Sequence, residues 1–491
     1  MRVNKVIQST LGLNIMTEAQ LSRIHYGTLE ILERVGVKVY EQESLELLHG
    51  SGARVEGELV KIPSPLVEKA LSTAPKGVTL SDRNGNRAVT MKKNSIYYGT
   101  GSEVPFTIDP YSGERRKPVK QDNRNAALMV DALEYTDFAM SLGVATDVPV
   151  YSSDLHQFEA MLLSTTKPIL FTAYNRRGLE YILQMAALAA GGMNRLRERP
   201  SLALYAEPSS PLFHSRDSLE KLLTCAQERI PLIYATTPML GATAPVTSGG
   251  ALVVANAEIL SGLVIHQLKL EGAPFVYGGG IPPMHMGTSI CSYGGPERDL
   301  GCISLVRLSQ YYNLPSFTTA GCTDAHTFDQ QAGMEAGFNL LIAGLAGGNL
   351  IHNLGYMGVG MTSCLEHLLL CNEAVGAVKH LLRGVNVSDD HLALDLIEKI
   401  GPGGHFLGEE HTMAHFRNEL YFPRILNRKS FDAWKIDGEA TFGEAANREV
   451  KLLLENHRPG RLEPEIEAGI KQIVEKRDQE VTTQRGGSSS A

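Results

Sequence analysis

The sequence predicts an α/β fold, a parallel (β/α)8 TIM-like barrel with an N-terminal α+β cap and a C-terminal helical extension. Three observations predict it. Eight apolar, β-prone runs occur in the middle of the chain, segments of helical periodicity separate most of them, and the runs are continuously apolar instead of alternating. An open doubly wound sheet also alternates strands with helices, but the count of eight favours a closed barrel.

The expected cap spans residues 1–94. Thr17 and Gln20 have the spacing of a capping box, and apolar residues then recur at helical spacing until Gly36. Short strand-like pieces follow, and a further helix is predicted from Ser64. This mixture of short helices and strands differs from the regular alternation that begins after it.

The expected barrel spans residues 95–384. Its strands are predicted at 95–101, 137–145, 168–175, 201–208, 231–238, 274–282, 315–324 and 349–356. Its helices are predicted at Asn123–Tyr135, Ser153–Thr165, Arg177–Ala190, Ser215–Arg229, Gly249–Leu270, Pro296–Tyr312, Asp329–Gly344 and Ser363–Arg383. Ser363 and Glu366 have the spacing of a capping box at the start of the last helix.

The pattern changes after the barrel, where a helical extension is expected over residues 385–480. His411 and His415 lie four residues apart and would share one face of a helix, but the glutamate of an HExxH motif is absent, so we predict a structural role for them. The tail, residues 481–491, is of low complexity and is expected to be disordered.

The composition is that of an ordinary globular protein, with 491 residues, 43% hydrophobic and 20% charged residues, and a formal net charge of −8. Basic residues are scattered, so we expect no nucleic-acid partner. We expect no membrane partner, because no apolar run looks long enough to span a bilayer and no signal-peptide pattern is visible. The six cysteines show no CxxC spacing, which predicts reduced thiols in the cytoplasm.

Catalysis in such barrels takes place at the C-terminal ends of the strands. Tyrosine is the most frequent residue type at the predicted ends, and lysine is absent from them. The candidate binding residues at these positions are Tyr97, Tyr98, Tyr174, Tyr205, Glu207, His352, Asn353 and Tyr356. Strand alternation allows only one of Tyr97 and Tyr98 to point inward. The glycines at 278–280 predict either a close backbone approach or room for a bulky ligand.

This inventory disfavours two kinds of chemistry. A Schiff-base enzyme needs a lysine at a strand end, and none is present. Only Glu207, Asp324 and His352 could bind a metal there, and they come from distant strands, so no metal is expected. Tyrosines with a carboxylate suit a quaternary ammonium ion, which aromatic faces recognise. For any single tyrosine of the set a packing role is the favoured explanation, although we expect at least two to line a pocket.

Three segments resemble the trimethylamine methyltransferase family. They are residues 97–118 ("YYGTGSEVPFTIDPYSGERRKP"), 321–360 ("GCTDAHTFDQQAG" and onward) and 411–434 ("HTMAHFRNELYFPRILNRKSFDAW"), and the likeness covers nearly the whole chain. The resemblance implies a (β/α)8 barrel and a homo-oligomer. It also implies transfer of a methyl group from a methylated amine to the cobalt(I) of a corrinoid (cobalamin) carried by a separate partner protein.

Trimethylamine enzymes of this family carry pyrrolysine in a segment resembling "CTDAHTFDQQAG". Here that segment contains only standard residues, and the equivalent position falls at or near Asp324 and His326. The chain therefore looks like the pyrrolysine-free members, which are similar to quaternary-amine demethylases acting on betaines. A quaternary nitrogen is already tetravalent, so the cobalt(I) can attack a methyl carbon in line and no catalytic residue of the protein is expected.

The resemblance suggests roles for the candidates. Tyr97 or Tyr98, with Tyr174, Tyr205 and Tyr356, would form an aromatic cage. Glu207 would lie near the positive nitrogen, and His352 and Asn353 would bind a substrate carboxylate; a satisfied core histidine is the alternative for His352. Glycine betaine is the preferred substrate, with proline betaine, carnitine, butyrobetaine or another methylamine as alternatives. A non-catalytic betaine-binding barrel, or a lyase or isomerase on the same scaffold, remains open.

Overall fold

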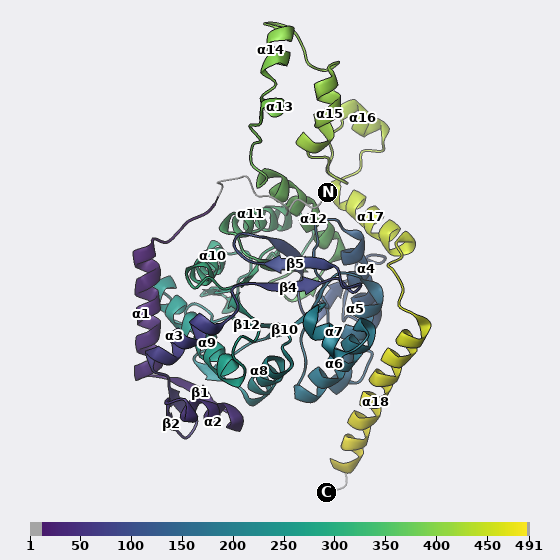
Figure 1. Cartoon of the computed structure of the whole chain (residues 1–491). Coiled ribbons are helices and arrows are strands. Elements are labelled where there is room, and N and C mark those ends of the chain that lie inside the picture. Colours follow the sequence, from purple (N-terminus) through teal and green to yellow (C-terminus); the bar gives the residue numbers. More distant parts are fainter. Residues whose placement is uncertain (1–11, 489–491) are drawn as a thin grey trace.

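The computed structural model describes residues 12–488, and its central element is a ring of parallel strands (Figure 1). Seven strands pair in the order β6-β17-β16-β13-β12-β10-β9. Their bounds are β6 Tyr97–Thr100, β9 Ile169–Phe171, β10 Leu202–Ala206, β12 Leu232–Thr236, β13 Phe275–Gly279, β16 Ser316–Thr319 and β17 Leu350–Leu354. Each falls inside a run predicted from the sequence.

The eighth position of the ring is filled by residues 138 and 139. Phe138 bridges Gly99 of β6 and Ala139 bridges Ile169 of β9, both in parallel. These two bridges join the ends of the seven-stranded sheet, so the barrel is closed and the doubly wound alternative is wrong. The predicted strand at 137–145 is reduced to these two contacts.

Helices surround the barrel at the predicted places (Figure 1). They are α4 Lys120–Ala132, α5 Ser153–Ser164, α6 Arg176–Ala190, α8 Arg216–Glu228, α9 Ser248–Lys269, α10 Pro296–Tyr311, α11 Gln330–Ala346 and α12 Leu365–Leu381, with the short η2 Val150–Ser152 and α7 Met193–Glu198 between them. The predicted capping box of Ser363 is wrong. Cys364 occupies the N-cap without a side-chain hydrogen bond, and the Ser363 hydroxyl donates to the carbonyl of Phe106 instead.

Helix α9 qualifies the membrane prediction. Among the described residues it is the one helix that is long and apolar enough to cross a bilayer. The prediction that no apolar run is long enough to span a bilayer is therefore wrong. However, 72% of its apolar window is buried within the protein. A buried helix needs apolar residues on every side, which explains the composition.

The N-terminal elements pack on one side of the barrel. They are α1 Glu18–Arg34, β1 Val37–Val39, α2 Gln42–Gly50, β2 Arg54–Glu56, β3 Leu59–Lys61 and α3 Ser64–Thr73. The predicted capping box at the start of α1 is confirmed, because the Thr17 and Gln20 side chains each bond the other's backbone N–H. Strand β1 also pairs with β11 (Phe213–His214), which ties these elements to the barrel.

A hairpin of β4 (Val78–Ser81) and β5 (Arg87–Met91) closes the N-terminal end of the barrel (Figure 1). Its apolar side chains share one buried cluster with residues near the starts of the barrel strands, namely Leu170, Ala203, Ile233, Val276, Phe317 and Leu350. Because this end is filled by side chains, a ligand has to enter from the opposite, C-terminal end.

Short strands shape the loops at that C-terminal end. They are β7 Phe106–Ile108, β8 Arg115–Arg116, β18 Tyr356–Met357 and β19 Thr362–Ser363, which form one sheet, and the hairpin of β14 Met284–His285 with β15 Ile290–Cys291. Hydrogen bonds between these segments fix loops that are distant in sequence. One of their residues, Tyr356, lines a cavity at this end of the barrel.

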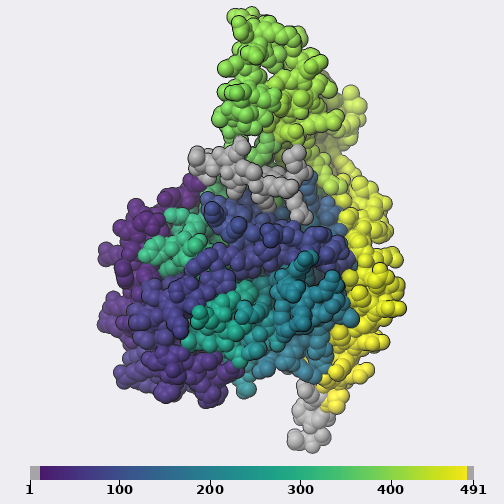
Figure 2. Space-filling model, viewed as in Figure 1, coloured from purple at the N-terminus to yellow at the C-terminus, as the bar shows by residue number. Residues whose placement is uncertain are grey.

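The C-terminal residues form a lobe and two helices that return along the barrel. The lobe contains α13 Asp389–Leu392, α14 Leu394–Ile400, α15 Glu410–Glu419 and α16 Phe431–Ile436, and it projects away from the barrel (Figures 1 and 2). Helix α17 (Phe442–Asn456) packs on α12 and α4, and α18 (Pro464–Ser488) on α5 and α6. The expected tail at 481–491 overlaps the end of α18, and its last three residues lie outside the described residues.

Candidate active site

A cavity of about 470 Å³ lies at the C-terminal ends of the barrel strands. It is bounded by residues from most strands and from the loops that follow them. The lining residues include Ser102, Glu103, Thr172, Tyr205, Glu207, Asp217, Lys221, Tyr293, Arg298, Phe317, His352, Asn353, Tyr356 and Gly360. Five of them are among the eight binding residues predicted from the sequence, namely Tyr205, Glu207, His352, Asn353 and Tyr356.

Aromatic rings form one wall of the cavity. The ring centroid of Tyr205 lies 5.2 Å from that of Phe317 and 5.9 Å from that of His352, and the Phe317 and His352 rings lie 4.2 Å apart. The Tyr356 hydroxyl is 3.3 Å from the Ser102 hydroxyl. Burial raises the pKa of Tyr356 well above its usual value, and Tyr293 nearby raises it further. These phenols are therefore neutral and present their rings and hydroxyls.

Gly101 makes room for this arrangement. A Cβ at that position would lie 2.3 Å from the ring of Tyr356, far inside van der Waals contact. The glycine-rich end of β6 in "YYGTG" thus admits a tyrosine from the loop after β17. This packing explains the glycine at position 101.

Two carboxylates line the same cavity. The hydroxyl of Tyr205 donates to Glu207, and the hydroxyl of Thr172 donates to Glu103. The surrounding protein raises the pKa of both carboxyls by desolvation, and the charge of Glu103 raises that of Glu207 further, while Lys221 opposes the rise. A cation placed in the cavity would relieve this cost, because it favours the ionised form of each carboxyl.

Strand β17 ends in an irregularity that exposes two neighbouring side chains to one cavity. Simple alternation would send Asn353 to the face opposite His352. The pairing register with β6 shifts between Ile351 and Leu354, and Asn353 has φ +84°, a left-handed conformation. This bulge lets both residues line the cavity, as bulges beside functional sites do. The Asn353 Oδ1 is buried and has no hydrogen-bond partner.

His352 is neutral and has a fixed tautomer. Its Nδ1 lies 2.9 Å from the carbonyl oxygen of Thr318, and a carbonyl only accepts, so Nδ1 carries the proton. Burial lowers the pKa of His352 to about 3, and the positive charge of Arg298 also lowers it. Nε2 is consequently left as an acceptor at neutral pH.

Arg298 supplies a buried positive charge that sequence reasoning did not single out. Its side chain is 2% exposed, and Nη1 donates to the carbonyl of Tyr293 at 2.9 Å and to Asp299 at 3.2 Å. The guanidinium lies over the Tyr293 ring, 5.6 Å from the centroid. Nη2 is buried with no partner. A desolvated guanidinium with an unused donor is suited to a carboxylate.

Three predicted cage residues do not line the cavity. Tyr97 packs in the apolar interior of the barrel, below the cavity. Tyr98 faces outward, where its hydroxyl donates to the carbonyl of Leu340. Tyr174 is 52% exposed and its ring packs against Tyr151. The structure therefore does not place these three tyrosines in the predicted aromatic cage. A position at a strand end does not define the direction or the depth of a side chain.

The two residues assigned to the pyrrolysine region also lie outside the cavity lining. Asp324 accepts hydrogen bonds from the Ser292 hydroxyl and the Tyr293 amide, both at 2.6 Å. It therefore holds the loop that carries Tyr293. His326 is exposed, and its ring lies near Gly358.

Several lining residues were missed by the sequence reasoning. Lys221 reaches the cavity from helix α8, although no strand end carries a lysine, and its Nζ donates to the carbonyl of Ala173 at 2.7 Å. Glu103 and Tyr293 lie in loops beyond the strand ends, and Arg298 lies in the first turn of α10. The two glycines before Arg298 were a usable signal, because they precede the helix whose first turn brings Arg298 to the cavity.

The closed barrel and its cavity define a TIM-barrel protein with a site at the C-terminal face, lined by aromatic rings, carboxylates and a buried arginine. Residues 1–482 match the family model "Trimethylamine methyltransferase (MTTB)", so the chain belongs to the trimethylamine methyltransferase family. It is a methyltransferase of the methylamine and betaine type.

Named relatives match over nearly their full lengths. The chain is 33% identical to a trimethylamine methyltransferase of Desulfitobacterium hafniense (strain DSM 10664 / DCB-2), covering 96% of this chain and 95% of that protein. It is 30% identical to a glycine betaine methyltransferase of D. hafniense (strain Y51), covering 95% and 98%. The monomethylamine methyltransferase of Methanosarcina barkeri is similar in fold, with a TM-score of 0.52, 12% identity and coverage of 92% and 89%.

Proposed function

We propose that this methyltransferase demethylates a quaternary ammonium substrate that carries a carboxylate, with glycine betaine as the first candidate, and delivers the methyl group to the cobalt of a corrinoid protein. The observation that carries the proposal is the buried Arg298, whose Nη2 has no partner, in the same cavity as a wall of tyrosines. A zwitterionic substrate has a carboxylate that would pair with Arg298 and an ammonium group that would lie against the tyrosines.

The ammonium end of the substrate would lie against Tyr205, Tyr356 and Tyr293. Aromatic faces attract a quaternary ammonium by roughly 0.5–2 kcal/mol per contact, and this attraction does not require a hydrogen bond from the ligand. Glu103 and Glu207 add negative charge beside the rings. The binding of a cation offsets the cost of keeping two desolvated carboxylates ionised.

The carboxylate end would pair with Arg298. Its guanidinium is buried and has an unused donor. The Nε2 of His352 accepts and cannot donate at neutral pH, so His352 shapes the cavity by packing on Phe317. This role replaces the predicted hydrogen bond from His352 to the substrate carboxylate. Asn353, which has a side-chain amide, stays a candidate for that contact.

The proposed reaction requires little acid–base catalysis from the protein. The acceptor cobalt(I) would supply the electron pair of a new cobalt–carbon bond. The carbon–nitrogen bond would break, and its electron pair would leave with a neutral tertiary amine that needs no proton. The protein has to orient one methyl group toward the open end and exclude water. The plugged opposite end and the aromatic wall meet these needs, and the neutral His352 offers no competing charge.

A methyl-transfer assay with reduced cobalamin tests the proposal. Glycine betaine, proline betaine, carnitine, butyrobetaine and trimethylamine are supplied in turn, and methylcobalamin and the demethylated amine are measured together. We expect a carboxylated quaternary amine to give stoichiometric transfer. Activity with trimethylamine alone, or turnover without any corrinoid, would falsify the proposal.

A pair of tyrosine variants provides the matched control. Tyr205 lies near the end of β10 and Tyr174 follows β9, but of the two only Tyr205 lines the cavity. Tyr205→Ala should weaken binding of the active betaine in calorimetry by roughly 2- to 30-fold, the equivalent of one aromatic contact, whereas Tyr174→Ala should bind it as the wild type does. Equal affinities for the two variants would place the site elsewhere.

A further inference from the structure

The projecting lobe has no hydrophobic core. No residue from 383 to 445 is buried, and none of the helices α13 to α16 contains a buried residue. Apolar burial is the main source of stability for a folded segment. Small units that lack enough of it are commonly stabilised by a disulfide or a metal ion, and none of the chain's six cysteines lies in this stretch.

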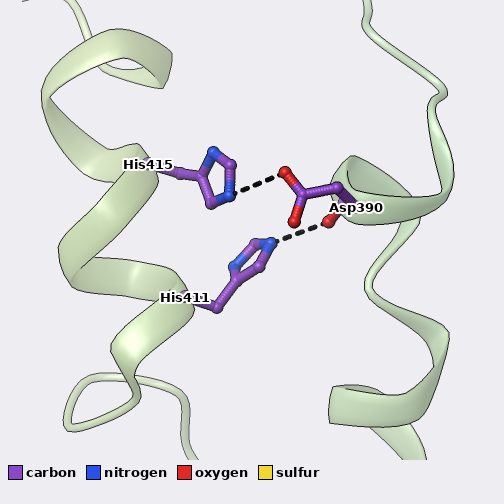
Figure 3. A group of neighbouring side chains, drawn as sticks. All are labelled: Asp390, His411 and His415. Carbon is purple, nitrogen blue, oxygen red and sulfur yellow. Dashed lines mark hydrogen bonds and ion pairs between the residues drawn. The ribbon is translucent and has the colours of Figure 1, made fainter.

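One polar cluster joins two elements of this lobe (Figure 3). His411 and His415 lie one turn apart on α15, with ring centroids 4.3 Å apart, and Asp390 faces them from α13. Nε2 of His415 is 3.1 Å from Oδ2 of Asp390, and Nε2 of His411 is 3.0 Å from the Asp390 carbonyl oxygen. One potential ligand atom from each residue lies within 4.8 Å of the others.

We propose that Asp390, His411 and His415 bind a divalent transition-metal ion of the zinc class that cross-links α13 to α15. Two histidines at positions i and i+4 and one carboxylate are a common zinc ligand set. Ligands about 2.0–2.1 Å from one tetrahedral ion are about 3.3 Å apart, close to the observed spacing of His415 and Asp390.

The surroundings favour three protein ligands with water in the fourth position. His391 is the nearest further imidazole, its ring centroid 4.9 Å from that of His415. Its Nδ1 is 2.8 Å from the Ser388 hydroxyl and its Nε2 is 3.1 Å from the Asn386 amide, so both nitrogens are already engaged. The cluster lies in the lobe and shares no residue with the cavity lining.

The prediction that His411 and His415 are only structural is thereby refined: their structural role would be exerted through a metal. The alternative is a plain ion pair between His415 and Asp390, which needs no ion. The two interpretations differ in whether one metal ion binds tightly and in whether that ion orders the lobe.

The test uses the full chain, stripped with a chelator and titrated with Zn²⁺ in a calorimeter and with Co²⁺ in an absorption cell. Wild type should bind one ion per chain, with the absorption bands of low-coordinate Co²⁺. His411→Ala and His415→Ala should each weaken Zn²⁺ binding by more than about 100-fold, because even outer partners of a ligand contribute 10–100-fold. The control is His405→Ala, an exposed histidine of the same lobe outside the cluster.

A second measurement separates metal binding from misfolding. Hydrogen exchange of residues 389–419 should slow when Zn²⁺ is added to the wild type, and Zn²⁺ should have no such effect on Asp390→Asn, which keeps the shape of the side chain. Unaltered Zn²⁺ affinity in both histidine variants, or a wild type that binds no stoichiometric ion, overturns the proposal. Neither outcome depends on methyl transfer, so the proposed activity is tested separately.

Discussion

Arg298 brings a buried positive charge to a cavity whose other ionisable groups are mostly acidic. If it binds the substrate carboxylate, Arg298→Gln should weaken glycine betaine binding by roughly 10–150-fold, the value of a charged hydrogen bond of about 1.5–3 kcal/mol. Tetramethylammonium has no carboxylate, so the variant should bind it no more weakly than the wild type does. Calorimetry with both ligands measures the difference.

The control for this change is Arg23→Gln. Arg23 is exposed on helix α1 and is not among the residues that line the cavity. It should bind both ligands as the wild type does. If Arg298→Gln weakened tetramethylammonium binding as much as glycine betaine binding, the arginine would be acting on the shape of the cavity and its assignment to the carboxylate would fail.

Glu103 and Glu207 make cation binding depend on pH. Burial raises the pKa of both carboxyls, and a bound onium favours their ionised forms, so binding releases protons. Affinity for tetramethylammonium should therefore rise with pH through the raised pKa values and then level off. His352, with a pKa of about 3, stays neutral over this range and does not contribute.

Glu207→Gln should flatten this profile and weaken binding at high pH by roughly tenfold, the equivalent of one pKa unit of linkage. Calorimetry at several pH values provides the measurement. Glu114→Gln, at an exposed position, should keep the wild-type profile. A profile that is flat in the wild type would show that the carboxylates do not meet the cation.

The sequence predicted which types of residue line the cavity better than it predicted which individual positions do. Tyrosine, glutamate and histidine at strand ends indicated an onium site, and Tyr205, Glu207, His352, Asn353 and Tyr356 do line the cavity. Whether they bind substrate stays a prediction. The sequence could not show the depth of each side chain, because depth depends on barrel tilt and on loops such as the one that carries Tyr293.

At the scale of elements, the glycines of β13 allow two barrel strands to approach closely. A Cβ on Gly278 would lie 1.9 Å from the carbonyl oxygen of Phe317 in β16. Gly278→Ala should therefore lower the free energy of unfolding by at least about 3 kcal/mol, at the upper end of overpacking costs. Urea unfolding measures it. The close backbone approach predicted for this run agrees with the geometry.

Gly337 in α11 is the matched control, because a Cβ there meets no atom within 4 Å. Gly337→Ala should raise the free energy of unfolding by about 0.5–1 kcal/mol, since alanine favours a helix interior. If both substitutions changed the free energy of unfolding by the same amount, the close contact between β13 and β16 would not explain the glycine at position 278.

Elements were predicted well where burial alone decides them. The seven paired strands are apolar along their length because helices cover one face and the barrel interior the other. The bulge of β17 at Asn353 and the two-residue bridge at Phe138 and Ala139 were not predictable. Both depend on pairing with strands distant in sequence, which the local pattern of residues does not encode.

At the scale of the whole molecule, the barrel has one filled end and one open end. The β4–β5 hairpin fills the N-terminal end, and the cavity lies at the other, beside Gly360. A corrinoid protein that accepts the methyl group, as we propose, would therefore approach the C-terminal face. Met361 follows Gly360 and is 45% exposed, which places it at the rim that such a partner would contact.

Met361→Arg should impair the encounter with the corrinoid protein without touching the substrate. We expect the methyl-transfer rate to that protein to fall by about tenfold, because altering the rim of an interface acts mainly on association. The calorimetric Kd for glycine betaine should stay unchanged. Asn84→Arg, at the tip of the hairpin on the opposite end, adds the same charge away from the rim and should leave both quantities as they are. A rate lost in Asn84→Arg but kept in Met361→Arg would mean that the partner docks on the plugged end, and the proposed route of methyl transfer through the cavity mouth would then be wrong.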